Sequence, residues 1–170
     1  MTPSPNKRAL STTKVSFCGL LVALALIFSY VEVLIPFNIG VPGVKLGVAN
    51  VVIIVALYHL DWKYAMSVNL VRVLIAGLLF TGAFGALYSL GGAILSMMVM
   101  ALLKRTDIFS IVGVSIAGGV CHNLGQILIA SFMVSNLKMF TYFPVLIFSG
   151  VASGAIIGVV AYLILKRLPQ

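Results

Sequence analysis

Long apolar stretches separated by short polar interruptions make up most of the chain. Six such stretches lie at residues 15–35, 46–60, 64–80, 86–103, 108–134 and 144–165. Runs of about 20 apolar residues are long enough to cross the hydrocarbon core of a bilayer as helices. The pattern therefore predicts an all-α polytopic membrane protein with six transmembrane helices.

The start of the chain is polar, and the first apolar stretch follows it directly. We expect residues 1–13 to be a disordered cytoplasmic N-terminus and residues 14–170 to form a single six-helix transmembrane domain. A cleaved signal peptide is the alternative, since Ala23-Leu24-Ala25 resembles a cleavage site. The apolar run continues beyond Tyr30, which is too long for the hydrophobic region of a signal peptide. We therefore interpret this stretch as a retained helix.

The stretch at 46–60 is the shortest of the six. At 1.5 Å per residue it covers about 22 Å, which is less than the roughly 30 Å of the hydrocarbon core. The apolar segment before it, PFNIGVPGVK, contains turn-forming residues and can dip into the membrane. Short or broken segments often line the substrate site of transporters. A short helix in a locally thinned bilayer is the alternative.

Composition and charge agree with this reading and give it an orientation. The chain is 62% hydrophobic and 8% charged, whereas soluble domains are about 25% charged. With the N-terminus inside, two basic residues fall in outer loops, Lys45 and Lys138, and Arg72 falls within a stretch. Eight fall on the cytoplasmic side: Lys7, Arg8, Lys14, Lys63, Lys104, Arg105, Lys166 and Arg167. This asymmetry predicts a multi-pass protein of the cell membrane with both termini cytoplasmic, and the net charge of +8 then needs no nucleic-acid partner.

Small residues at every fourth position mark two helix faces that can approach another helix closely. Gly150, Gly154 and Gly158 form one such stripe in the last stretch, and packing inside the bundle is its favoured reading. Gly19 and Ala23 form a shorter pair in the first stretch. For this pair, contact with a helix of a partner protein competes with packing inside the bundle.

Arg72 is the most conspicuous polar residue inside an apolar stretch. Asn69 lies three residues earlier, on the same face of the predicted helix. Glu32 is the only carboxylate within a stretch. A buried arginine requires an anion, so one interpretation is a structural Arg72–Glu32 pair. The other is that Arg72 faces a cavity and binds an anionic substrate.

Other polar residues point to a site in the outer half of the bundle. His122, Asn123 and Gln126 are spaced so that all three can project toward one interior region. A hydrogen-bonded clamp between helices is the alternative to a lined pocket. Asn50 and Lys45 add a further amide and a positive charge near the short stretch. The candidate substrate-binding residues are therefore Arg72, His122, Asn123, Gln126, Asn50, Lys45, Glu32 and Asn69.

Several catalytic chemistries lack their residues. The two aspartates, Asp61 and Asp107, are too far apart in the sequence to form the carboxylate cluster that holds Mg²⁺ for prenyl transfer. No Gly-rich phosphate loop typical of ATPases occurs. His59 and His122 do not belong to a set of ligands with the spacing of a zinc site, so a zinc site is not expected. We predict no catalytic residue, metal or cofactor, so activity as an enzyme is the less favoured reading.

Two segments resemble a known family: PGVKLGVANVV at residues 42–52 and HNLGQ at residues 122–126. The resemblance is to the Gx transporter family, also called heptaprenyl diphosphate synthase component I. That family in turn is similar to the substrate-binding S components of energy-coupling factor transporters. This implies an S-component-like bundle that binds a small solute from outside and depends on a coupling protein and two ATPases.

The resemblance implies further expectations. Gly19 and Ala23 match the small-residue face that S components present to their coupling protein, and loop 36–45 matches their substrate-capping loop. The expected function is uptake of a small anionic vitamin-like solute or of an isoprenoid or quinone precursor. The alternative is a non-catalytic membrane subunit of a heptaprenyl diphosphate synthase system in menaquinone biosynthesis, with a soluble prenyl synthase partner. A purely structural protein is a third reading, which leaves Arg72 and the cluster at 122–126 without a role.

Overall fold

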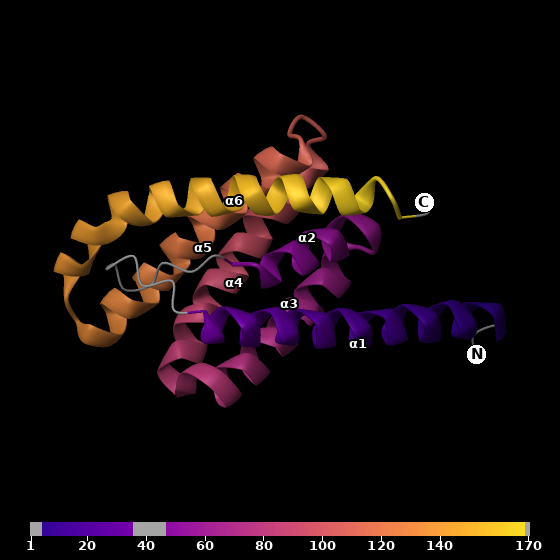
Figure 1. Ribbon diagram of the computed structural model, residues 1–170, viewed down its shortest axis with the longest axis horizontal. Helices are drawn as coiled ribbons and strands as arrows, with labels where there is room; N and C mark the ends of the chain where they lie inside the picture. Colours follow the sequence, from indigo (N-terminus) through magenta and orange to yellow (C-terminus); the bar gives the residue numbers. More distant parts are fainter. Residues whose placement is uncertain (1–4, 36–46, 169–170) are drawn as a thin grey trace.

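The computed structural model describes the backbone of residues 5–35 and 47–168, with side chains from Thr12 onward in these ranges. Within them most residues are helical and no strand occurs, so the all-α prediction is confirmed. The elements are α1 Pro5–Leu34, α2 Ala49–His59, α3 Trp62–Ala76, η1 Gly77–Thr81, α4 Gly82–Arg105, α5 Ile111–Val134, η2 Leu137–Tyr142 and α6 Phe143–Leu165. The start of α1 and the end of α6 lie at the same end of the bundle, on the right in Figure 1.

The expectation of six separate spans is not confirmed. Four helical segments in the described residues are long and apolar enough to cross a membrane, namely Thr12–Leu34, Trp62–Arg105, Ile111–Val134 and Leu137–Leu165. The apolar helix α2 is shorter than a span. The count falls below six partly because the residues between the third and fourth apolar stretches are helical. As a result, α3, the π-helical turn η1 and α4 form one continuous segment of 44 residues.

That long segment reverses direction near its middle. Gly82 has a φ of +74°, a left-handed conformation that glycine adopts without steric cost. Beyond the turn α4 packs beside α3, since Asn69 Nδ2 donates a hydrogen bond to the carbonyl oxygen of Ala93 at 3.4 Å. At Gly77 an added Cβ would lie 2.3 Å from that of Ala86. The two glycines thus allow the reversal and the close approach of α3 and α4.

The N-terminal part differs from the sequence expectation in where the helix begins. Helix α1 starts at Pro5, well before Lys14, so its first turns occupy residues expected to precede the domain. The segment 36–45, expected to cap the site, lies outside the described residues, and so does Lys45.

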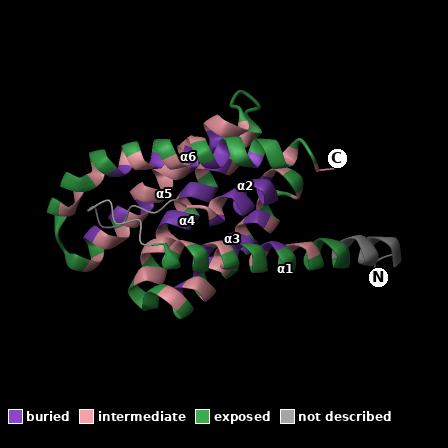
Figure 2. Cartoon of the chain, viewed as in Figure 1, coloured by how far each residue is buried: buried purple, intermediate pink, exposed green. Residues whose placement is uncertain are grey.

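Helix α2 lies at the centre of the bundle. Its residues from Val51 to Leu57 are all buried, and Figure 2 shows α2 almost entirely in the colour of buried residues. A helix that is apolar on every face is stable in a protein core or in lipid, and the burial of α2 shows that other helices surround it here. Its 11 residues extend about 16 Å. The short stretch in the sequence is thus a short buried helix, and its N-terminal end lies inside the bundle.

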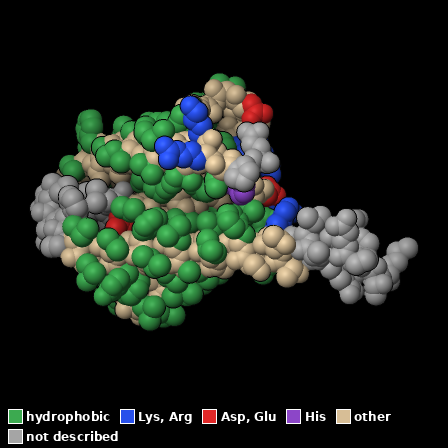
Figure 3. All heavy atoms as spheres, turned by 45° about the vertical axis from the view of Figure 1, so that its right-hand side comes forward, with side chains coloured by type: hydrophobic (Ala, Val, Ile, Leu, Met, Phe, Trp, Pro, Cys, Tyr) green, Lys and Arg blue, Asp and Glu red, His purple; other side chains and the backbone are tan. Residues whose placement is uncertain are grey.

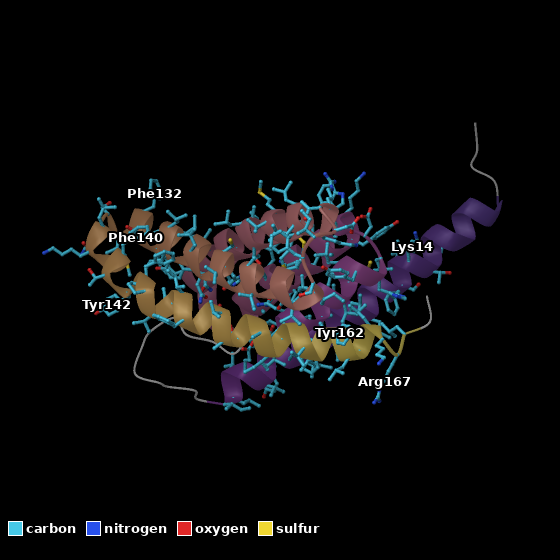
Figure 4. All side chains as sticks on the ribbon, turned by 90° about the horizontal axis from the view of Figure 1, so that it is seen from above. Lys14, Phe132, Phe140, Tyr142, Tyr162 and Arg167 are labelled. Atoms are coloured by element: carbon cyan, nitrogen blue, oxygen red, sulfur yellow. The ribbon has the colours of Figure 1, made fainter. Side chains whose placement is uncertain are left out.

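The outer surface of the bundle is apolar. Leu78, Phe132 and Phe148 are 77%, 84% and 77% exposed, and hydrophobic side chains cover most of the face in Figure 3. Soluble monomers rarely expose contiguous apolar surfaces of this extent, whereas a bilayer covers them. Lys14, Tyr162 and Arg167 lie toward one end of the bundle, and Phe132, Phe140 and Tyr142 toward the other (Figure 4). The chain is therefore a membrane protein.

Helices α5 and α6 meet along a glycine seam, which we define as Gly150, Gly154 and Gly158 of α6 with the α5 backbone opposite them. An added Cβ at Gly154 would lie 2.7 Å from Cα of Ile116, and one at Gly158 would lie 2.8 Å from Cα of Val112. The hydroxyl of Ser115 donates to the carbonyl oxygen of Gly154 at 2.6 Å across the seam. The stripe in the last stretch therefore serves packing inside the bundle, as its favoured reading held.

Candidate substrate-binding cavity

A cavity of about 320 Å³ lies among the helices and receives side chains from all six of them. Its volume falls at the lower end of the range of small-molecule sites, which is about 300–1,000 Å³. Six of the eight candidate residues line it: Glu32, Asn50, Arg72, His122, Asn123 and Gln126. Of the other two, Asn69 lies behind the cavity wall and Lys45 is outside the described residues. The structure therefore gathers residues that are as much as 94 positions apart in the chain, from Glu32 to Gln126.

Arg72 is held in the cavity wall by neutral amides. Its Nη2 donates to Oδ1 of Asn69 at 2.7 Å and to Oδ1 of Asn50 at 3.2 Å. Its Nε is buried and has no hydrogen-bond partner in the described part of the chain. Neither amide carries charge, so these two hydrogen bonds do not neutralise the guanidinium.

Asn69 sets the position of this guanidinium without reaching the cavity. Its side chain is 2% exposed and lies between α3 and α4. The amide nitrogen donates to the carbonyl oxygen of Ala93, so the amide oxygen faces Arg72, one turn further along α3. The spacing of three residues, visible in the sequence, is what brings the two side chains together.

The turn into α2 supplies the other partner of Arg72. Gly47 has a φ of +72°, and its carbonyl oxygen accepts a hydrogen bond from the backbone nitrogen of Asn50 at 2.8 Å. An added Cβ at Gly47 would lie 3.1 Å from Nδ2 of Asn50 and 3.3 Å from Cδ1 of Ile157. Glycine therefore fits both the left-handed conformation and the limited space, and it places the side chain of Asn50 beside Arg72.

Glu32 contacts the same turn from α1. Its Oε1 accepts a hydrogen bond from the backbone nitrogen of Gly47. The hydrogen bonds of Arg72 in the described residues go to Asn50 and Asn69, so the structural Arg72–Glu32 pair considered from the sequence is not formed there. Both charged side chains nevertheless line the same cavity.

The cluster at 122–126 in α5 forms another part of the wall. Nδ2 of Asn123 donates to the carbonyl oxygen of Leu146 in α6 at 2.7 Å, and Asn123 also lines the cavity. His122 and Gln126 lie against Gly92 of α4, where an added Cβ would come within 3.1 Å of both side chains. The clamp and the lined pocket are thus both present: Asn123 joins two helices while it lines the cavity.

Sequence reasoning missed several small residues of the wall. Ser96, Ser115 and Gly118 line the cavity on α4 and α5. Serine gives a weak signal inside an apolar helix because its hydroxyl can bond to its own backbone, as Ser29 does to the carbonyl oxygen of Ala25 at 2.9 Å. Gly92 was missed as well, although it makes room for two candidate side chains. The one sequence feature that could have indicated these positions is that serines and glycines recur in the apolar stretches that form α4 and α5.

Gly19 and Ala23 do not contribute to the cavity. Both are exposed on α1, and an added Cβ at Gly19 would have no atom within 4 Å. The buried face of α1 instead carries Leu21, Ala25 and Ser29. In the described residues no group of three or more His, Cys, Asp or Glu side chains is placed to hold a metal ion.

A family model described as heptaprenyl diphosphate synthase component I matches residues 21–164. The chain belongs to this family. It is the Gx transporter family that the two sequence segments resemble. No curated protein and no solved structure matches the chain.

The component I match includes the whole cavity. Its described lining residues, from Ser29 on α1 to Ile157 on α6, all fall inside the matched range, and so does Ala23, whereas Gly19 precedes it. The structure thus places polar residues from several helices around one cavity.

Proposed function

We propose that this protein is the substrate-binding membrane component of an energy-coupling-factor-type uptake transporter, and that its cavity binds a small anionic solute. The observation that carries the proposal is Arg72. It lines the cavity, its hydrogen-bond partners are two neutral amides, and its Nε is buried without a hydrogen bond in the described residues.

The energetic reason lies in the cost of an unpaired charge. Charged side chains within a membrane protein are expensive and normally meet an opposite charge. The amides of Asn50 and Asn69 orient the guanidinium but do not neutralise it. A carboxylate or phosphate in the cavity would supply the opposite charge and charge-assisted hydrogen bonds to the guanidinium, and such bonds are roughly twice as strong as neutral ones.

The size of the cavity restricts the solute. At roughly 30 Å³ for each water-sized group, a cavity of about 320 Å³ holds on the order of ten such groups. A vitamin-like acid or the head of a quinone precursor is of this order. A seven-unit prenyl chain is several times larger and would have to extend out of the cavity.

The same proposal includes a topology of six crossings in the cell membrane with both termini cytoplasmic. Cationic and aromatic side chains gather at one end: Lys104 lies 5.0 Å from the ring of Tyr58, and Arg105 lies 5.9 Å from that of Trp62. Lys14 at the same end lies 5.7 Å from the ring of Tyr64. Such a belt is typical of the cytoplasmic interface, and the reversal at Gly82 supports separate crossings by α3 and α4.

The partners proposed for transport are a coupling protein and two ATPases. Gly19 and Ala23 lie on the outward face of α1, where a helix of the coupling protein could approach closely. The chain itself has no ATPase motif, so it must receive its energy from another protein.

The second candidate is a non-catalytic membrane subunit of a heptaprenyl diphosphate synthase system, which the family description favours. It requires a soluble prenyl synthase that docks at the cytoplasmic end. Purification of the tagged protein from its native membrane separates the two candidates. A recovered coupling protein with ATPases supports transport, whereas a recovered prenyl synthase supports the second candidate.

Binding is tested with the purified protein in lipid nanodiscs, incubated with a cell metabolite extract. Retained compounds are released and identified by mass spectrometry. Arg72→Gln removes the charge inside the cavity, and Lys138→Gln removes one from the exposed turn η2 as a matched control. We expect an anionic compound to be retained by the parent protein and by Lys138→Gln, and at least about thirtyfold less by Arg72→Gln.

Thermal unfolding of both variants shows whether they are folded. Equal retention by a folded Arg72→Gln variant would contradict the proposal, as would retention of uncharged compounds alone.

A further inference from the structure

The cavity contains a second charge, whose role is not explained by an anionic solute. Among its described lining residues the ionisable side chains are Glu32 on α1, Arg72 on α3 and His122 on α5. A carboxylate in the wall repels an anion unless another part of the ligand compensates for it. An anionic solute bound at Arg72 therefore leaves the carboxylate of Glu32 without a role in binding.

The turn at the start of α2 lies between the two opposite charges. On one side the backbone nitrogen of Gly47 donates to Glu32. On the other side the amide oxygen of Asn50 accepts from Arg72. The carbonyl oxygen of Gly47 accepts from the backbone nitrogen of Asn50 at 2.8 Å, so one short turn contacts both charged groups.

This arrangement keeps two attracting groups from pairing directly. In a medium of low dielectric constant a carboxylate and a guanidinium attract each other strongly. Glu32 is fixed by the backbone of Gly47, and Arg72 is fixed by two amides. The backbone hydrogen bond from Asn50 to Gly47 closes the turn. A polar site whose groups are fixed in advance is suited to a ligand that carries the complementary groups.

We propose that the ligand of this cavity is a small zwitterion, with its anionic group at Arg72 and a cationic amino group at Glu32. The inference rests on the proposed binding function of the cavity. It narrows the solute from any small anion to one that bears both charges on a body of the order of ten non-hydrogen atoms, as an amino acid or an amino-acid-like compound does.

Matched probes test the second charge separately from the first. Each set contains a free amino acid, the carboxylic acid that lacks its amino group, and the amine that lacks its carboxyl group. Sets are made for each apolar side chain from alanine to phenylalanine, so that ligand shape varies independently of charge. Binding to the full chain in nanodiscs is measured by equilibrium dialysis at neutral pH.

We expect at least one set in which the amino acid binds about tenfold more tightly than both of its singly charged relatives. Glu32→Gln keeps an oxygen that can accept from Gly47 but removes the charge. In this variant the amino acid should bind no more tightly than the matched acid. Asp107→Asn removes a negative charge from an exposed position with a φ of +53°, which asparagine tolerates, and should leave the tenfold preference intact.

Three results would overturn the inference. In the first, the acids bind as tightly as the amino acids in every set. In the second, the preference for the amino acid survives in Glu32→Gln. In the third, no member of any set binds. The first two leave the proposed function standing if retention of an anion from the metabolite extract depends on Arg72. Loss of that Arg72 dependence removes both proposals.

Discussion

Gly154 in α6 and Gly19 in α1 stand in the same sequence pattern, a small residue followed by another four positions later, but their surroundings in the folded chain are opposite. An added Cβ at Gly154 would lie 2.7 Å from Cα of Ile116 and 2.8 Å from the carbonyl oxygen of Ser115. An added Cβ at Gly19 would have nothing within 4 Å. One pattern is closed by a neighbouring helix, and the other is open to the surroundings of the protein.

The difference shows what a small-residue stripe means in a membrane protein. Such a stripe allows another helix to approach closely. Whether a helix of the same chain does so depends on which face of the helix is turned toward the interior of the bundle. Helix α1 turns Leu21 and Ala25 inward and leaves Gly19 outside. Helix α6 turns its glycines onto α5, where Ser115 adds a hydrogen bond at 2.6 Å.

The largest effect is expected for Gly154→Ala in the glycine seam. The added methyl group meets backbone atoms of α5, which cannot rotate away as a side chain would. Separating the helices costs packing along the whole seam, and we expect a loss of about 3 kcal/mol in the free energy of unfolding. Reversible unfolding in mixed micelles measures it. A change below about 1 kcal/mol would show that the seam is looser than these distances imply.

A smaller loss is expected for Gly125→Ala, at the contact of α5 with α4. The new Cβ would lie 2.5 Å from the carbonyl oxygen of Gly91 and 2.8 Å from Cα of Gly92. These are backbone atoms, as at Gly154, but the contact does not belong to the three-glycine seam of α6, and we expect a loss of about 2 kcal/mol. The same unfolding assay tests it, and a gain in stability would contradict close packing between these helices.

Ser115→Ala tests the hydrogen bond across the glycine seam without adding volume. Removal of the hydroxyl leaves the carbonyl oxygen of Gly154 with its helical partner, so we expect a loss of about 1 kcal/mol. The exposed Ser16→Ala in α1 is the matched control and should change stability by less than about 0.5 kcal/mol. Equal effects at the two serines would mean that the bond across the seam contributes nothing.

The smallest effect, and one of opposite sign, is expected for Gly19→Ala. Alanine is the better helix former, and the new methyl group meets no atom of the chain. We expect the free energy of unfolding to stay unchanged or to rise by up to about 1 kcal/mol. A clear loss in the isolated protein would show that Gly19 packs against another part of the same chain, and the comparison with Gly154 would fail.

The apolar pattern predicted the helices well but not how they follow one another. Every predicted stretch contains a helix, because a long apolar run favours a helix through its local sequence alone. The junction at 81–85 was expected to be a loop and is helical, since the reversal needs only the left-handed Gly82 and the π-helical turn before it. Helix α1 begins at Pro5 because the polar residues before Lys14 can extend a helix whose apolar part is already anchored.

Part of the candidate site was also readable from residue types. An arginine, an asparagine one turn away and a short polar cluster in an apolar helix are too costly to occur there without partners. Which residues are the hydrogen-bond partners of these side chains could not be predicted from the sequence. Asn50 meets Arg72 only because α2 is buried in the bundle, and Asn69 lies behind the cavity wall because its amide nitrogen bonds to the carbonyl oxygen of Ala93.

The sequence by itself determined that this chain is a helical membrane protein with a few polar residues in its interior, since apolar length and the cost of buried charge are properties of the chain. The tertiary structure alone decided that Glu32 and Arg72 share a cavity without pairing. That outcome depends on the turn at Gly47 and Asn50, which contacts both side chains, and on the helix faces turned inward. Contacts between helices follow from the packing of surfaces far apart in the sequence, and no local pattern encodes them.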